Sequence, residues 1–259
     1  MHVTLNDVVD LMNKIAPADM AEAWDNVGLM LGRRKTIINR IMVALDITPE
    51  VVEQAINSRI DLIITHHPLI FKPLRSLSDD QWQQSLLLTL AEHNIAVYSA
   101  HTNLDAVNGG VNDALAQALE LQDDDILDDD SNIGRIGNVK TTSLEEFAAR
   151  VKKKLGADYV VVGNAGKSVC RVAVCGGAGC DFIDIALAKG ADTLVTGDVK
   201  YHDAQKAVYS GLNIIDAGHQ ATERLVLEEI ADRLSIHFTQ LNWNIAVLIA
   251  DQKLLLKHI

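Results

Sequence analysis

Apolar positions along the chain follow two spacings, and the alternation between them predicts the secondary structure. Between residues 5 and 15, apolar side chains recur every three or four positions, which is the spacing of an amphipathic helix. Short runs rich in β-branched residues, such as 62–65 and 193–196, are instead typical of buried strands. Helical and strand patterns alternate along the whole chain, and this alternation predicts an α/β fold.

Turn and cap signals set the expected limits of these elements. Strands are expected at 29–31, 38–45, 62–65, 95–99, 159–162, 169–174, 193–196 and 212–215. Helices are expected at 5–15, 49–58, 81–93, 111–121 and 144–155. Three more are expected in the second half: one that ends near 189, one between 202 and 212, and one that ends near 234. We interpret the acidic segment 123–130 as a solvated connector without chemistry of its own.

The order helix, strand, strand, helix, strand, helix, strand, helix occurs twice, and the two halves keep register. The run IDLIIT at 60–65 corresponds to ADTLVT at 191–196. A histidine four residues before an acid appears in both halves, as His101 with Asp105 and as His219 with Glu223. We therefore predict an internal duplication with two α/β repeats, at 1–127 and 128–259, forming two lobes.

A pair of adjacent histidines, His66 and His67, follows directly after the apolar run at 62–65. Neighbouring residues of a strand point to opposite faces, so both imidazoles can reach one site only if the strand ends there. Pro68 predicts that end, because proline cannot donate to the strand ladder. Two interpretations stay open at this point: paired metal ligands at the end of a sheet, or loop histidines without a partner.

The duplication favours the metal interpretation. If the two lobes face each other, their strand-end side chains converge on one cleft between the repeats. This donor set suits Zn²⁺, Mn²⁺, Fe²⁺ or Ni²⁺, and its carboxylates can bridge two cations. The alternative is that the lobes point apart and these side chains only cap helices and loops. The predicted ligands are His66, His67, Asp105, His219 and Glu223.

Composition limits the classes of partner. The formal net charge of the 259 residues is −12, which argues against a broad binding surface for nucleic acid. No basic segment followed by an apolar run opens the chain, and no apolar stretch reaches the roughly 18 residues that span a bilayer. We expect a cytoplasmic protein without membrane contact, in which Cys170, Cys175 and Cys180 are small core residues.

Five motifs together resemble the NIF-three-like family, whose members are commonly labelled GTP cyclohydrolase 1 type 2 homologues. They are WDNVGL at 24–29, THHPLIF at 65–71, SAHTNLD at 99–105, TGDVKYH at 196–202 and GHQATE at 218–223. The resemblance implies that the five predicted ligands bind two divalent metal ions per chain. It also implies two intertwined α/β repeats and a ring-shaped homohexamer with metal sites facing the inner cavity. The connector at 123–138 is too short for the extra domain that some relatives carry.

Several residues near the predicted site keep two interpretations. His101 is either a ligand or proton shuttle beside the metals, or a histidine that orients Asp105. Lys200 and His202 either bind substrate and move protons or lie on the surface. The basic residues at 33–34, 72 and 75 either contact an anion or are solvated, and we expect them to be solvated. We expect WDN at 24–26 to fix a turn and the glycines at 176–179 to form a tight turn. The apolar tail at 245–259 is either a strand or a helix.

The first functional hypothesis is a dinuclear metal-dependent hydrolase acting on a small molecule. The family label implies attack on the purine ring of GTP, and a phosphoester or cyclic amide would use the same metals. The alternative is a non-catalytic metal-binding hexamer that recruits a protein partner. DNA binding inside a ring is the weakest hypothesis, because the chain is acidic.

Overall fold

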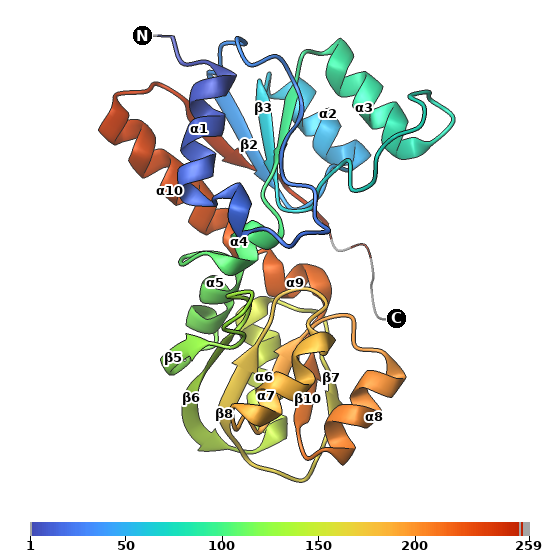
Figure 1. The fold of residues 1–259 in the computed structure, drawn as a ribbon, viewed down its shortest axis with the longest axis vertical. Helices are drawn as coiled ribbons and strands as arrows, with labels where there is room; N and C mark the ends of the chain where they lie inside the picture. Colours follow the sequence, from blue (N-terminus) through green and yellow to red (C-terminus); the bar gives the residue numbers. More distant parts are fainter. Residues whose placement is uncertain (1, 254, 256–259) are drawn as a thin grey trace. The chain divides into compact units, whose positions relative to one another are not determined.

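The computed structural model describes residues 2–253 and 255 and contains two compact units, each built around one mixed sheet (Figure 1). The first unit consists of Met1–Val107 together with Leu227–Lys253. The second unit consists chiefly of Asn108–Val226. Each unit therefore has its own sheet, helices and core, as expected for an α/β protein.

The first sheet has the strand order β1-β4-β3-β2-β11. Its strands are parallel except for β1, which pairs antiparallel with β4 at one edge. Thr65 at the end of β3 pairs with Ser99 at the end of β4, so the side chains that follow them gather at one edge. The strands are β1 (Gly28–Leu31), β2 (Arg40–Ala44), β3 (Leu62–Thr65), β4 (Ala96–Ser99) and β11 (Ala246–Ile249).

Helices of the first unit begin where the cap signals predict. Thr4 and Asp7 form a capping box at α1, in which each side chain accepts a hydrogen bond from the backbone of the other. Thr48 caps α2 by accepting a hydrogen bond from Val51 N–H at 3.3 Å. The helices are α1 (Leu5–Ile15), η1 (Ala18–Met20), α2 (Pro49–Asn57), α3 (Trp82–Glu92), α4 (Thr102–Ala106) and α10 (Val226–Leu241).

The second sheet has the order β5-β6-β8-β9-β10-β7, with β8, β9 and β10 parallel. Its strands are β5 (Gln122–Ile126), β6 (Arg135–Thr142), β7 (Val161–Gly163), β8 (Val169–Val174), β9 (Thr193–Thr196) and β10 (Asn213–Asp216). Its helices are α5 (Val111–Ala118), α6 (Leu144–Leu155), η2 (Cys180–Phe182), α7 (Ile183–Ala188), α8 (Tyr201–Tyr209) and α9 (His219–Glu223). None of the helices in the described part of the chain is long and apolar enough to span a membrane.

The two sheets confirm the duplication. The neighbours β1-β4-β3-β2 correspond to β7-β10-β9-β8 in chain order, in parallel pairing and in their antiparallel edge strand. Each predicted repeat also contributes one strand to the other sheet. β5 of the first repeat pairs with β6 in the second sheet, whereas β11 of the second repeat follows α10 and pairs with β2 in the first sheet. The fold is therefore two intertwined α/β repeats.

The acidic connector is partly a strand, contrary to the sequence prediction. β5 covers Gln122–Ile126 and pairs antiparallel with β6, and β6 was not predicted at all. The sequence of β6, RIGNVKTT, lacks a clean apolar alternation because it contains glycine, asparagine and lysine. β5 carries three aspartates at the sheet edge, where charged side chains oppose pairing with other chains.

The apolar tail forms β11, which is parallel to β2 in the first sheet. Residues 254 and 256–259 of the predicted tail lie outside the described residues. The division at 127/128 concerns the sequence repeat and stays a prediction. The compact units follow other ranges, because α10 and β11 return to the first sheet after the second unit is complete.

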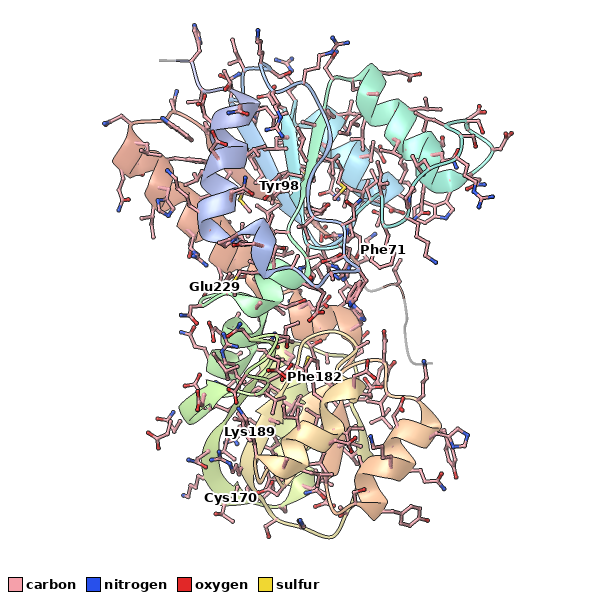
Figure 2. The ribbon with its side chains drawn as sticks, viewed as in Figure 1. Phe71, Tyr98, Cys170, Phe182, Lys189 and Glu229 are labelled. Carbon is pink, nitrogen blue, oxygen red and sulfur yellow. The ribbon has the colours of Figure 1, made fainter. Side chains whose placement is uncertain are left out.

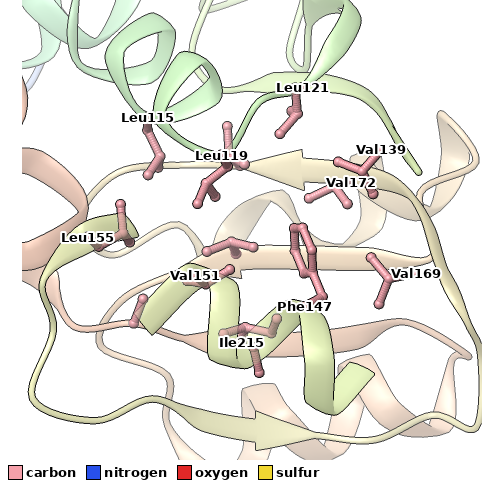
Figure 3. Packing of buried hydrophobic residues seen from close by; sticks show 14 of the residues in the cluster. Leu115, Leu119, Leu121, Val139, Phe147, Val151, Leu155, Val169, Val172 and Ile215 are labelled. Atoms are coloured by element: carbon pink, nitrogen blue, oxygen red, sulfur yellow. The ribbon is translucent and has the colours of Figure 1, made fainter. Parts of the chain in front are cut away.

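The core of the second unit explains why the weakly hydrophobic segment 144–155 is helical. α6 buries Phe147, Val151 and Leu155 in one core cluster with Val169 and Val172 of β8, and the Phe147 ring lies beside these two valines (Figure 3). These helix positions are four residues apart and form one apolar face. Phe147 is fully buried, so its truncation to alanine removes about 3–5 kcal/mol of stability.

The cysteines differ in burial, although all are free thiols. Cys175 is buried, as predicted, and Cys180 is partly buried. Cys170 is exposed near the start of β8, so its interpretation as a core residue was wrong (Figure 2). Burial raises the pKa of Cys180 to about 11, which keeps that thiol protonated at neutral pH.

Candidate metal centre

The histidine pair lies just beyond the end of β3. His66 N–H donates to Ala44 O at 3.1 Å, and His67 N–H donates to Leu45 O at 2.9 Å. The backbone therefore follows β2 for two residues after the strand has ended. Pro68, which has no N–H, ends this hydrogen-bond ladder. The strand end predicted at the histidine pair is confirmed.

Three imidazoles of the first unit form one cluster. His66, His67 and His101 each offer a nitrogen, and these nitrogens lie within 4.8 Å of one another. The ring centroid of His101 lies 5.1 Å from that of His66 and 5.7 Å from that of His67. Asp105 Oδ1 lies 3.7 Å from His66 Nε2. The first unit thus brings together four predicted site residues of a kind that binds metal.

The three imidazoles share one orientation. The Nδ1 atoms of His66, His67 and His101 lie 2.8–3.0 Å from an oxygen that can only accept: Ala100 O, an Asp46 carboxylate oxygen and an Asp25 carboxylate oxygen, respectively. The Nδ1 atoms therefore carry the protons, and each Nε2 keeps its lone pair for a ligand. Histidines that bind metals are commonly held in this way.

Asp25 is a site residue that the sequence did not reveal. Its side chain is 0% exposed and binds His101 through Oδ1. Its Oδ2 accepts hydrogen bonds from Thr102 N–H at 3.0 Å and from the Thr102 hydroxyl at 2.5 Å. Burial alone would raise the pKa of Asp25, but the hydrogen bonds from His101 and Thr102 outweigh it and hold this pKa far below its ordinary value. His101 is therefore oriented by Asp25.

The neighbours of Asp25 also reach the cluster. The Trp24 ring is 61% exposed, and its centroid lies 6.0 Å from that of Phe71 and 6.2 Å from that of His101. The Asn26 amide donates a hydrogen bond to Ile70 O. The motif at 24–26 fixes a turn, as predicted, because Asn26 N–H donates to Asp25 Oδ1 at 2.8 Å. It also supports His101 and the loop that follows His67.

The second unit presents a smaller donor set at the start of α9. His219 Nε2 lies 3.2 Å from Glu223 Oε1, four residues further along the helix. Asp198 Oδ2 lies 2.8 Å from His219 Nδ1, so this imidazole has the same orientation as those of the first unit. The Glu223 side chain is only 5% exposed. These are donors of a kind that can hold a metal ion.

Glycines make room for these donors. A Cβ on Gly177 would overlap Glu223 Oε1 and lie 3.3 Å from His219 Cε1. A Cβ on Gly197 would lie 2.6 Å from His219 N. Gly177 also adopts φ +64°, a left-handed conformation that favours glycine. The glycine turn at 176–179 thus permits a close approach of backbone to the donors.

Lys200 and His202 lie at the start of α8 and are both exposed. His202 Nδ1 lies 3.5 Å from Gln205 Oε1, and its ring centroid lies 5.3 Å from that of Tyr201. Among the described residues, neither side chain has a hydrogen bond or ion pair with His219 or Glu223. Their role in substrate binding or proton transfer stays a prediction.

The predicted ligands thus fall into one set for each unit. His66, His67 and Asp105 lie together in the first unit, with His101 beside them. His219 and Glu223 lie together in the second unit. That the two sets serve the same metal ions stays a prediction.

Comparison with known sequences identifies a family similarity over nearly the whole chain. The sequence model described as Duf34/NIF3 (NGG1p interacting factor 3) matches residues 3–254. A protein of Lactococcus lactis subsp. lactis (strain IL1403), named GTP cyclohydrolase 1 type 2 homolog, is 37% identical over 234 residues. The match covers 89% of this chain and 91% of that protein.

Solved structures have the same fold. The Staphylococcus aureus hypothetical protein SA1388 matches with a TM-score of 0.94 and 29% identity over 100% of both chains. Reduced HcgD from Methanocaldococcus jannaschii matches with a TM-score of 0.83 and 32% identity, over 97% of this chain and 99% of that one. The two-unit α/β architecture therefore recurs in other proteins along essentially their full length.

Proposed function

The chain belongs to the Duf34/NIF3 family, and from this premise we propose that it is a divalent-metal-dependent hydrolase of a small molecule. The proposed centre holds two cations per chain, drawn from zinc, iron, manganese and nickel. Imidazoles together with carboxylates fit such cations, which are softer than calcium or magnesium. The proposed ligands are His66, His67, Asp105, His219 and Glu223.

The observation that carries this proposal is the clustering of imidazoles that share one orientation. His66, His67, His101 and His219 each have Nδ1 within 3.0 Å of a carbonyl or carboxylate oxygen. His93, an exposed residue at the end of α3, has the same contact with Thr89 O at 2.8 Å, so the contact alone does not mark a ligand. At the site it is combined with clustering, because His66, His67 and His101 place nitrogens within 4.8 Å of one another. The Nδ1 contact fixes the tautomer in which Nε2 can bind a cation, and it raises the basicity of the ligand atom.

Two bound cations would acidify a water molecule and polarise the bond under attack. Asp105 and Glu223 each offer two oxygens, which suits carboxylates shared between cations. His101, held by Asp25, presents Nε2 beside His66 and His67, where it can accept a proton from the attacking water or donate one to the leaving group. Lys200 and His202 complete the proposal as candidates for substrate binding and proton transfer.

The first substrate to assay is GTP, because relatives carry the name GTP cyclohydrolase 1 type 2 homolog. Ring opening of its purine would be hydrolysis of a cyclic C–N bond, and cyclic amides and phosphodiesters are the comparison substrates. This substrate rests on the names of relatives and not on the site, because the same donors would serve any of these reactions.

A second candidate is a non-catalytic metal-binding scaffold, in the form of a homohexameric ring that recruits a protein partner. Its support is the exposed aromatic face of α8, where Tyr201 and Tyr209 flank a shallow cavity of about 200 Å³. Exposed tyrosines are enriched at protein interfaces. Turnover by the metal-loaded protein separates the two candidates, and sedimentation tests the hexamer.

The test is metal content by elemental analysis, combined with turnover of the same preparations. We expect two metals per native chain and loss of at least one from Glu223→Ala, with turnover falling in parallel. Glu145→Ala, which removes an exposed glutamate of α6, is the matched control and should keep both metals. Unchanged metal content in Glu223→Ala would contradict the proposed ligand set. Full metal content without turnover on any substrate class would favour the scaffold.

A further inference from the structure

A cavity of about 410 Å³ opens in the first unit, between the loop that follows the histidine pair and the start of α3. Its lining begins at Leu69, two residues after His67, and runs through the loop to Ser76. The side of α3 supplies Gln83 and Leu87. This volume lies within the range of small-molecule sites. None of the predicted metal ligands, nor His101, Lys200 or His202, lines this cavity.

Both ends of the lining loop are tied to the fold. At the first end, the Asn26 amide donates to Ile70 O. At the far end, Ser78 N–H donates to Gln84 Oε1 at 3.0 Å, and Gln84 Nε2 donates to Gln81 Oε1 at 3.1 Å. The Gln84 side chain is buried, and a buried amide needs hydrogen-bond partners, which Ser78 and Gln81 supply. These contacts hold both ends of the loop that lines the cavity.

The lining is cationic on a chain whose formal net charge is −12. Lys72 and Arg75 both line the cavity, and no described lining residue is a carboxylate. Within the described residues, neither cationic side chain makes a hydrogen bond or an ion pair. Two uncompensated cations at a concave surface attract an anion, and the amide groups of Gln81 and Gln83 can add hydrogen bonds to it.

Much of the remaining lining is apolar. Leu69, Leu74 and Leu87 supply aliphatic surface, and the Phe71 ring supplies an aromatic face. Phe71 is 45% exposed and labelled in Figure 2. A purely inorganic anion would leave this apolar surface in contact with water. The lining therefore fits an organic anion, with a negatively charged group toward Lys72 and Arg75 and an apolar body against the leucines.

Phe71 connects the cavity to the histidine cluster. Its ring lines the cavity, and its centroid lies 6.4 Å from that of His101 and 6.0 Å from that of Trp24. We propose that this cavity binds the anionic, partly apolar portion of the substrate while the reacting group lies at the histidines. This inference rests on the proposed hydrolase function, but binding at the cavity can be measured without metal or turnover.

The test uses two fluorescent probes that differ in one charged group. 8-Anilino-1-naphthalenesulfonate is an aromatic anion, and N-phenyl-1-naphthylamine has the same rings without the sulfonate. In the full chain, Lys72→Gln/Arg75→Gln should raise the dissociation constant of the sulfonate about tenfold and leave that of the uncharged probe unchanged. The matched control is Arg33→Gln/Lys35→Gln, which removes the same two charges from an exposed turn and should change neither constant.

A second variant separates binding in the cavity from a general attraction of anions. Gln83→Trp adds bulk at an exposed position of the lining without changing the charge. It should raise the dissociation constants of both probes about tenfold. The proposed site would be overturned if the dissociation constant of the sulfonate probe were unchanged in Lys72→Gln/Arg75→Gln. It would also be overturned if that constant changed equally in the control variant Arg33→Gln/Lys35→Gln. Metal content of the same preparations reports separately on the metal centre, so failure of the two proposals can be told apart.

Discussion

The two units place different side chains at equivalent strand ends. After β3, which ends at Thr65, the first unit has His66 and His67. After β9, which ends at Thr196, the second unit has Gly197 and Asp198. The pairing Thr65 with Ser99 corresponds to Thr196 with Asp216, so these positions are structurally equivalent. A position that holds an imidazole in one unit therefore holds an orienting carboxylate in the other.

The next strand ends are more alike, and their difference lies in how each histidine is oriented. His101 follows β4 and precedes Asp105 by four residues, as His219 follows β10 and precedes Glu223. His101 is held by the buried Asp25 from the segment before β1, whereas His219 is held by the half-exposed Asp198. The first unit therefore has more donors, and the carboxylate that orients His101 is buried, whereas the second unit has fewer donors and a half-exposed orienting carboxylate.

The largest effect should come from filling the space beside the donors of the second unit. In Gly177→Ala the new methyl overlaps Glu223 Oε1, so the carboxylate or the turn must move. We expect metal affinity to fall on the order of 100-fold, the upper end of what loss of ligand support causes. Competition with a chelator of known affinity, monitored by metal release, measures this change.

Gly156→Ala is the matched control for that substitution. Gly156 has φ +60°, close to the +64° of Gly177, so both alanines adopt the same unfavourable backbone conformation. The nearest atom to a Cβ on Gly156 is Arg224 Nη2 at 3.8 Å, so no overlap arises there. Equal metal affinity in the two variants would mean that overlap with Glu223 does not matter.

A smaller effect should follow Asp25→Asn in the donor-rich unit. The substitution keeps the shape of the side chain but removes the charge that accepts from His101 and Thr102. Because Asp25 holds the proposed proton-transfer group, we expect turnover to fall about tenfold and the free energy of unfolding to fall by about 2 kcal/mol. Asp19→Asn, at an exposed aspartate of η1, is the control and should change neither quantity.

The pH dependence of this stability difference follows from the lowered pKa of Asp25. A carboxyl whose pKa is lower in the folded than in the unfolded state stabilises the fold above its ordinary value of 3.8. That contribution is lost as the pH falls toward the folded-state pKa. In urea unfolding, the difference in free energy of unfolding between the native protein and Asp25→Asn should therefore be constant from pH 7 to about 4 and become smaller below pH 4. The same difference at pH 3 as at pH 7 would contradict this account.

The sequence predicted most of the elements because local signals and burial agree. β3, β8 and β9 occupy the predicted ranges, and α1 and α2 begin at their predicted caps. The His66 and His67 pair could be located because Pro68 must end the strand. These predictions succeed because each depends on residues that are close together in the chain.

The missed features depend on contacts between distant segments. Asp25 binds a histidine 76 positions away, and nothing near Asp25 in the sequence indicates that partner. β6 pairs with β8 and β5, and its irregular sequence becomes a strand only in that setting. β11 joins a sheet whose nearest strand, β2, ends about 200 residues earlier.

The smallest effect should come from Asp198→Asn, the counterpart of Asp25→Asn in the second unit. Asparagine tolerates the φ of +55° at this position, so the substitution tests only the charge that holds His219. The Asp198 side chain is 54% exposed, and exposed ion pairs contribute about 0.2–1 kcal/mol. We expect metal affinity to fall no more than about fivefold, measured by the same chelator competition. A fall in turnover equal to that of Asp25→Asn would mean that burial of the orienting carboxylate does not distinguish the two units.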